Sequence, residues 1–251
     1  MSGHSKWSTI KRKKSANDAK RGKLFTKLAR DITIAARQGG DPDANFALRL
    51  AIDRARAANM PKENIERAIK RGTGELKDTE EIIEVLYEAY APHGVALLVE
   101  AATDNRNRTT AALKHVLSRG GGSMAEPGSV SWQFEQKGYI TIPADKHNYD
   151  DVFMIAADAG ADDVVGDADL IEVYTPRESL HAVLEALRGA GITVEEARLE
   201  WVPKTSLDLE PEAALKVMNL IEELEDQDDT QMVYSNLNVT SELMASFEAA
   251  G

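Results

Sequence analysis

The sequence predicts an α+β protein, with a basic helical domain at the N-terminus and two α/β domains, at least one of them ferredoxin-like. Apolar residues recur at three- and four-residue steps through the first 74 positions, a spacing typical of amphipathic helices. Beyond residue 79, short apolar runs alternate with helical segments, which is typical of mixed sheets. Residues 138–203 show the order strand, helix, strand, strand, helix, strand of a ferredoxin-like unit.

Three helices are expected near the N-terminus, over residues 15–38, 42–59 and 61–72. The first carries an apolar stripe, formed by Leu24, Leu28, Ile32 and Ala35. Gly39-Gly40 ends this helix, and Asp41-Pro42 supplies an N-cap and a first-turn proline for the next one. Because residues 72–79 read as a linker, residues 1–78 are predicted to be one helical domain with an N-terminal arm.

A discontinuous α/β domain is predicted over residues 79–135 and 205–240, followed by a variable tail at 241–251. Its expected strands cover residues 82–90, 95–102, 129–134, 206–209 and 232–237. In the third of these, every second residue lies on the same face, which Val130, Trp132 and Phe134 therefore share. Its expected helices are 105–119, with Asp104 as the N-cap, and 211–224.

The intervening residues 136–204 are predicted to be an inserted ferredoxin-like domain. Its strands are expected at residues 139–142, 164–165, 170–174 and 193–202, and its first helix at 149–159. Thr175-Pro176-Arg177-Glu178 has the pattern of a capping box with proline at the first helical position. A second helix is therefore expected to begin there and to end at Arg188.

Charge is divided unevenly along the chain, whose net charge is −12. Residues 1–74 contain 18 Lys and Arg against 7 Asp and Glu, a net of +11, and the remaining residues carry a net of −23. Such asymmetry favours a polyanion-binding segment attached to an acidic body. A solvated helical surface is the alternative, but it does not explain an excess this one-sided.

The arm and the first helix hold candidate nucleic-acid contacts, because phosphate binding needs several cations close together. The cations concerned are Lys6, Lys11, Arg12, Lys13, Lys14, Lys20, Arg21, Lys23, Lys27 and Arg30. A disordered, solubilising arm is the alternative for the lysines, although the arm and the helix stripe reinforce each other. Trp7 either stacks on a base or packs on the helical domain, and the sequence leaves both open.

Residues 104–110 lie at a predicted strand-to-helix junction, where Arg106 and Arg108 accompany small polar side chains. A helix N-terminus with two arginines suits a phosphate, although capping with surface arginines explains the pattern equally well. The glycine-rich stretch 120–129 follows a helix rather than a strand, so a flexible connection is expected there. The acidic run 222–229 lacks the spacing of a calcium loop and is interpreted as a solvated helix end that repels nucleic acid.

Catalysis finds no support in the sequence, so no enzyme, cofactor, metal or small-molecule substrate is expected. The chain has no cysteine, and its five histidines are far apart in the sequence. The longest apolar run, Val95 to Ala102, is interrupted by Glu100 and is too short to span a membrane. We therefore expect a cytoplasmic protein whose partner is nucleic acid, and the sequence leaves its oligomeric state open.

Several stretches together resemble the YebC family, also called YebC/PmpR, from one end of the chain almost to the other. The matching residues are 1–7, 10–11, 13–14, 23–25, 59–65, 68–69, 87–95, 103–109, 128–130 and 233–236. Met232 departs from the polar residue expected there, and the resemblance fades after about Val239. Because the match begins at Met1, we expect no presequence and a bacterial, cytoplasmic member.

The resemblance implies three domains, with the third inserted in the second, and it implies two alternative functions. Bacterial members of the family are described as DNA-binding transcriptional regulators. Other members resemble ribosome-associated translation factors that help decoding of difficult stretches such as consecutive prolines, and mitochondrial members activate translation of cytochrome oxidase subunit I. DNA and ribosomal RNA are both polyanions, so the basic arm does not decide between these partners.

Overall fold

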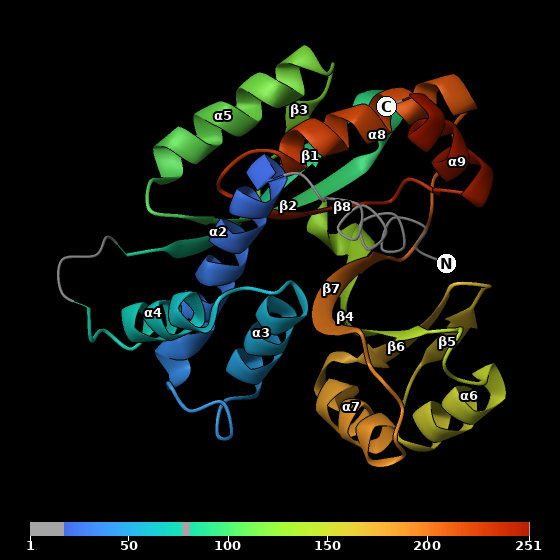
Figure 1. Cartoon of the computed structure of the whole chain (residues 1–251). Coiled ribbons are helices and arrows are strands. Elements are labelled where there is room, and N and C mark those ends of the chain that lie inside the picture. The colour runs from blue at the N-terminus through green and yellow to red at the C-terminus, as the bar shows by residue number, and fades with distance from the viewer. Residues whose placement is uncertain (1–17, 77–80, 251) are drawn as a thin grey trace. The chain divides into compact units, whose positions relative to one another are not determined.

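The computed structural model describes residues 18–76 and 81–250, without the side chains of residues 18–20, 241 and 248–250 (Figure 1). Its contacts divide the chain into two compact units. The first unit comprises Met1–Ile34, Gly74–Glu135 and Val202–Gly251, and the second comprises Ala35–Thr73 and Gln136–Trp201. The α+β fold class is confirmed, with an N-terminal helical region and two sheets.

The first unit is built on a four-stranded sheet with the order β3-β1-β2-β8. The strands are β1 (Ile83–Tyr90), β2 (Ala96–Thr103), β3 (Ser123–Met124) and β8 (Thr230–Ser235). The helices of this unit are α2 (Asp18–Ala35), α5 (Arg106–Arg119), α8 (Pro211–Glu225) and α9 (Ser241–Ala250). Central strand β2 pairs antiparallel with β1 and with β8, so the C-terminal part of the chain completes the sheet, as the sequence predicts.

One face of this sheet carries the core of the first unit, because alternate strand residues point to it. Leu97, Val99 and Ala101 of β2 are almost fully buried there, together with apolar residues of α5, α8 and α9. Figure 1 shows α5 and α8 on the same side of the sheet. The helical periodicity predicted for these two segments is therefore confirmed.

Two predicted strands of the first unit are wrong. Residues 129–134 form a short 3-10 turn, Ser131–Gln133, in which Val130 and Phe134 are buried while Trp132 is exposed. The backbone N–H groups of Val130 and Ser131 donate to the carboxylate of Glu88 and not to a strand neighbour. Residues 206–209 make only an isolated parallel bridge, between Leu207 and Leu237.

The second unit contains α3 (Phe46–Ala57), α4 (Lys62–Gly72) and a second sheet with the order β5-β6-β4-β7. This sheet is formed by β4 (Phe134–Pro143), β5 (Asp163–Gly166), β6 (Leu170–Pro176) and β7 (Glu196–Pro203). Helices α6 (Tyr149–Asp158) and α7 (Leu180–Gly189) connect β4 to β5 and β6 to β7. The connection pattern and strand order are those of a ferredoxin-like fold, which confirms the prediction for these residues.

Apolar residues of this sheet pack against α6 and α7, while its other face carries a buried polar network. Arg198 forms ion pairs with Glu196 at 2.6 Å and Glu200 at 2.9 Å, and its guanidinium lies 4.6 Å from the ring centroid of Tyr139. Burial, followed by the charges of Glu200 and Glu172, raises the pKa of Tyr139 well above its ordinary value. Tyr139 therefore stays protonated and donates its hydroxyl hydrogen to Glu172 at 2.5 Å.

Three predicted helix starts are wrong in detail. The second helix begins at Phe46 rather than Pro42, and Asn45, not Asp41, caps it by accepting the N–H of Leu48 at 3.1 Å. Asn105, not Asp104, caps α5, because the Asn105 side chain accepts the N–H of Arg108 at 3.1 Å. No capping box forms at Thr175: the chain makes a 3-10 turn at Arg177–Ser179, and α7 begins at Leu180. The Thr175 hydroxyl donates instead to the carbonyl oxygen of Pro176.

Candidate nucleic-acid interface

Asp229, in the loop between α8 and β8, is the centre of a hydrogen-bonded cluster in the first unit. Its side chain is 7% exposed. It accepts hydrogen bonds from the hydroxyls of Thr109 at 2.7 Å and Thr103 at 3.2 Å. The guanidinium of Arg108 donates to both of its carboxylate oxygens, at 2.8 and 3.0 Å, and that of Arg30 donates to one, at 3.0 Å. We call these five residues the Asp229 cluster.

The electrostatics of the Asp229 cluster favour the charged carboxylate. Burial alone would raise the pKa of Asp229, because it removes water from the charged form. Hydrogen bonds from Thr109 and Arg108 and the positive charge of Arg30 outweigh burial, so the pKa of Asp229 is lowered. The cluster therefore places two arginines, predicted separately as nucleic-acid contacts, on one ionised carboxylate.

Most of the conspicuous segment 103–109 is explained by this cluster. Thr103 ends β2, Arg108 and Thr109 lie in the first turn of α5, and all three side chains contact Asp229. Asp104 adds an ion pair to Arg108 at 2.8 Å. The side chain of Arg108 nevertheless remains 53% exposed, so part of its guanidinium still faces solvent.

The basic face of α2 contacts the C-terminal end of α8. Lys23 donates to the carbonyl oxygen of Asp226 at 3.1 Å, and Lys27 donates to that of Glu225 at 2.7 Å. Arg30 donates to the carbonyl oxygen of Asp228 as well as to Asp229. Cations are stabilising at a helix C-terminus, where carbonyl groups lack helical partners and the helix dipole is negative. These three predicted contact residues therefore also have a structural role.

The acidic run 222–229 is predicted as a solvated helix end, which holds for the exposed side chains of Glu223, Asp226 and Asp228 but not for Asp229. Its repulsion of nucleic acid stays a prediction. Asp229 is buried, and the carbonyl groups of Glu225, Asp226 and Asp228 bind the basic face of α2. An aspartate placed directly before the buried strand β8 is the sequence signal that could have indicated this role. Sequence spacing could not have indicated its partners, because Thr103 lies 126 residues away.

Two of the remaining predicted cations, Arg106 and Arg21, have side chains that the structure describes. Arg106 is exposed at the first turn of α5, and its guanidinium makes no hydrogen bond or ion pair within the described part of the chain. Arg21 is exposed, with its guanidinium 5.5 Å from the ring centroid of Phe25. Outside the described residues or side chains lie Lys6, Trp7, Lys11, Arg12, Lys13, Lys14 and Lys20.

A second buried carboxylate, Glu88 of β1, shapes the glycine-containing loop 126–131. It is 7% exposed and accepts backbone N–H groups from Gly128 at 2.6 Å, Val130 at 2.5 Å and Ser131 at 2.8 Å. Burial would raise the pKa of Glu88, but these three hydrogen bonds more than offset it and the pKa is lowered. The loop is thus held at three points by one side chain, whereas the sequence predicted a flexible connection.

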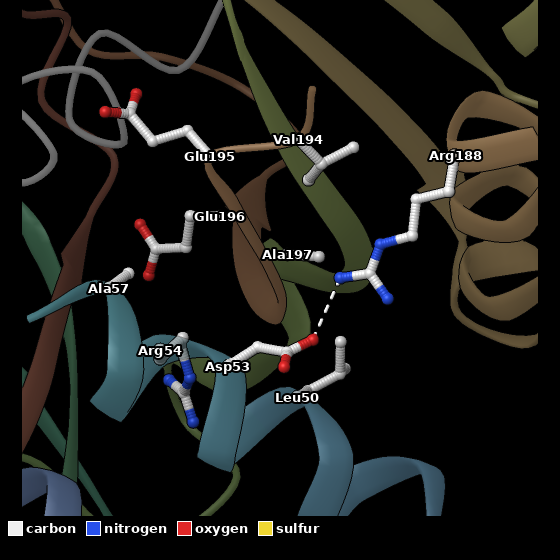
Figure 2. Close-up of a pocket in the computed structure, with 9 residues that line it drawn as sticks. All are labelled: Leu50, Asp53, Arg54, Ala57, Arg188, Val194, Glu195, Glu196 and Ala197. Atoms are coloured by element: carbon white, nitrogen blue, oxygen red, sulfur yellow. Dashed lines mark hydrogen bonds and ion pairs between the residues drawn. The ribbon is translucent and has the colours of Figure 1, made fainter. Parts of the chain in front are cut away.

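A cavity of about 460 Å³ lies within the second unit and was not predicted. Figure 2 shows Arg188 directed toward Asp53, with which it forms an ion pair at 2.9 Å. Glu195 and Glu196 are directed away from this pair. The other lining residues are Leu50, Arg54, Ala57, Val194 and Ala197. Because its acidic and basic groups do not converge on one point, the cavity offers no defined anion or metal site.

Across residues 18–76 and 81–250, no three His, Asp or Glu side chains lie close enough together to hold a metal ion. In the same part of the chain, no helix is both long and apolar enough to cross a membrane.

The helical region and the two sheets are those of a known class of α+β protein. Residues 5–75 match the TACO1/YebC protein N-terminal domain, and residues 82–237 match the TACO1/YebC second and third domain. The chain belongs to the TACO1/YebC family.

Proteins with curated names resemble the chain over its whole length. A relative from Chloroflexus aurantiacus is 54% identical, over 99% of this chain and 100% of its own. Another, from Acidithiobacillus ferrooxidans, is 51% identical over 99% of both chains. Each is named "Probable transcriptional regulatory protein". These names point to a regulator rather than an enzyme.

A solved structure supports the fold. The crystal structure of a conserved hypothetical protein from Aquifex aeolicus is 45% identical in sequence, with a TM-score of 0.83. The similarity covers 89% of this chain and 93% of that one.

Proposed function

We propose that the chain is a nucleic-acid-binding regulator of gene expression that acts as a DNA-binding transcriptional regulator. The observation that carries the proposal is the Asp229 cluster, which orients the half-exposed Arg108 beside the N-terminus of α5. Helix N-termini favour phosphate oxygens, and the Nη1 group of Arg108, which has no hydrogen bond among the described residues, can donate to one. The names of the relatives and the net charge of +11 over residues 1–74 support the same conclusion.

Phosphate contacts position a protein on duplex DNA, whereas base contacts specify a sequence. Arg106 and Arg108 are suited to phosphate binding, because they lie in the first turn of a helix, where backbone N–H groups and the helix dipole favour anions. The arm cations Lys11, Arg12, Lys13 and Lys14 would add further phosphate contacts. We therefore expect binding that depends strongly on salt.

Binding of labelled duplex DNA, followed by fluorescence anisotropy over a range of salt concentrations, tests this proposal. Arg106→Ala is expected to weaken binding and to lower the salt slope by about one. Lys114→Ala is the matched control, because Lys114 is an exposed cation on the same helix, two turns further from its start. Equal effects of the two substitutions would show that only overall charge matters at α5.

The arm is tested by changing Lys11, Arg12, Lys13 and Lys14 together to Glu. This variant is expected to lose DNA binding while its thermal unfolding stays like that of the wild type. Unchanged affinity would remove the arm from the mechanism.

Sedimentation of the tagged protein through a sucrose gradient tests the cellular partner. Loss of fast-sedimenting protein after DNase treatment is the expected result. Co-migration with ribosomal particles that is abolished by RNase would contradict the choice of DNA and favour a translation factor.

A further inference from the structure

Trp132 is the most exposed large apolar side chain in the described part of the chain, with a relative exposure of 66%. It lies in the 3-10 turn Ser131–Gln133, between the loop held by Glu88 and the start of β4. An indole in water forgoes the stabilisation that burial of its large apolar surface would give. A tryptophan held outside the core by hydrogen bonds is suited to a contact surface, because this residue type is enriched at interfaces.

The orientation of Trp132 is fixed from several sides. Its indole N–H donates to the carbonyl oxygen of Ser129 at 2.9 Å, and its own carbonyl oxygen accepts from the ammonium of Lys204 at 2.8 Å. Tyr90 donates its hydroxyl to the same Ser129 oxygen at 3.3 Å, and Glu88 holds the preceding backbone. The only polar group of the indole is therefore satisfied within the protein, which leaves its flat aromatic surface for a partner.

A cation is held at the backbone of the same residue, because the ammonium of Lys204 donates to the carbonyl oxygen of Trp132. Lys204 is exposed, and its ammonium has three N–H donors, so donors remain for a phosphate oxygen besides the one used by Trp132. Two exposed glutamates near the turn, Glu126 and Glu135, keep the patch from being a general polyanion site. Binding here therefore has to draw on the indole itself as well as on charge.

We propose that Trp132 and Lys204 form a binding site for an unpaired nucleotide, in which the base stacks on the indole and its phosphate contacts the ammonium. Base–aromatic stacking tolerates any sequence, because every base presents a flat face, but it requires a base that is not already stacked in a duplex. The occupant is thus a single-stranded stretch of nucleic acid. The inference rests on the proposed function and adds to it a preference for melted over paired strands.

Fluorescence anisotropy with oligonucleotides of about 20 nucleotides, longer than usual single-strand site sizes, tests the inference. The probes are single-stranded DNA, single-stranded RNA and the duplex of the same sequence. Trp132→Ala is expected to weaken binding of the single strands by roughly 5- to 150-fold, the range that stacking gives, and to leave duplex binding unchanged. Lys204→Gln is expected to have a smaller effect, together with a reduced salt slope.

Three further variants distinguish aromatic stacking from simple apolar contact. Trp132→Phe keeps an aromatic ring and should retain most of the affinity, whereas Trp132→Leu keeps apolar surface without a ring and should behave like Trp132→Ala. Phe153→Ala removes another exposed aromatic, 43% exposed on α6, and should change nothing. Equal binding of the single strands by the Leu and Phe variants would overturn the inference, because apolar surface without a ring would then suffice.

The outcomes for the two proposals are distinct. If Trp132→Ala binds single strands with the same affinity as the wild type, the stacking site would be overturned but the proposed function would stand. Failure of the wild type to bind any of the three probes would overturn the proposed function and this inference with it. Preference of the single-stranded RNA probe over DNA, lost in Trp132→Ala, would support the stacking site and count against DNA as the target.

Discussion

Asp229 and Glu88 are both buried carboxylates of the first unit, with exposures of 6% and 7%, and both have lowered pKa values. They differ in what they bind. Asp229 accepts hydrogen bonds from two hydroxyls and two guanidinium groups, on three separate segments of the chain. Glu88 accepts three backbone N–H groups and a hydrogen bond from the Ser131 side chain, all from a single loop. One carboxylate thus joins distant segments and holds cations, whereas the other fixes one local backbone shape.

This difference separates two ways of preparing a surface for a partner. The Asp229 cluster orients charged groups that neutralise one another only in part, because Arg108 remains half exposed. The Glu88 loop presents an uncharged aromatic side chain, Trp132. The negative charge of Glu88 itself is stabilised by hydrogen bonds within the protein. Removing either carboxylate should therefore affect stability and binding in different proportions.

The largest effect is expected for Asp229→Asn, which keeps the size of the side chain and removes its charge. Arg30 and Arg108 would lose their common carboxylate, and the free energy of unfolding should fall by about 3 kcal/mol, as for a partly buried ion pair with one partner removed. Urea unfolding measures this. Asp228→Asn, at the exposed neighbouring position, is the matched control and should change stability by no more than about 0.5 kcal/mol. Similar urea midpoints for the two variants would show that the cluster does not stabilise the fold.

A smaller and more local effect is expected for Glu88→Gln. An amide offers one acceptor oxygen, and its NH₂ group would face backbone donors, so a loss of about 2 kcal/mol is expected. Hydrogen exchange should accelerate at the amides of Gly128, Val130 and Ser131 more than in β2. Uniform acceleration over the whole first unit would contradict the local role assigned to Glu88. Single-strand binding should fall together with loop protection.

The smallest effect is expected at low pH, where the free energies of unfolding of the wild type and Asp229→Asn should approach each other. Because the pKa of Asp229 is lowered in the folded state, its stabilisation is present above the unfolded pKa of about 4 and disappears as pH falls through the folded value. The stability difference between the two proteins should therefore shrink below about pH 4, by about 1.4 kcal/mol for each unit of pKa shift. Thermal unfolding between neutral pH and pH 3 measures it. A difference independent of pH would mean that Asp229 acts through packing rather than charge.

Periodicity in the sequence was sufficient for the regular elements. The apolar steps in 105–119 and 211–224 predicted α5 and α8 almost to the residue, and the strand–helix order of 138–203 predicted the ferredoxin-like topology. Alternation failed at Val130, Trp132 and Phe134, where the sequence pattern of a strand is used for a turn. The hydrogen-bond acceptor for that turn, Glu88, lies more than 40 residues earlier, so no local pattern could reveal it.

The candidate site was predictable only in its parts. Charge and helical spacing identified Lys23, Lys27, Arg30, Arg106 and Arg108 as exposed or partly exposed cations. Apart from Arg106, these cations contact Asp229 or the carbonyl groups at the end of α8 and just after it, about 200 residues from α2. Spacing gives the face on which a side chain lies but not the segment that packs there. The contacts of the arm and the separate folding of three domains stay predictions.

The pairing of β2 with β8 has a consequence for the order in which the molecule is made. During synthesis from the N-terminus, residues 134–203 are complete before β8 emerges, so the ferredoxin-like sheet can fold while β2 still lacks one neighbour. Joining Leu98 to Tyr234 closes a very long loop, which is an intrinsically slow step. A nascent chain that stops before Asp229 would therefore display its arginines without the carboxylate that orients them. Competence to bind would then arrive late, with the last tenth of the polypeptide.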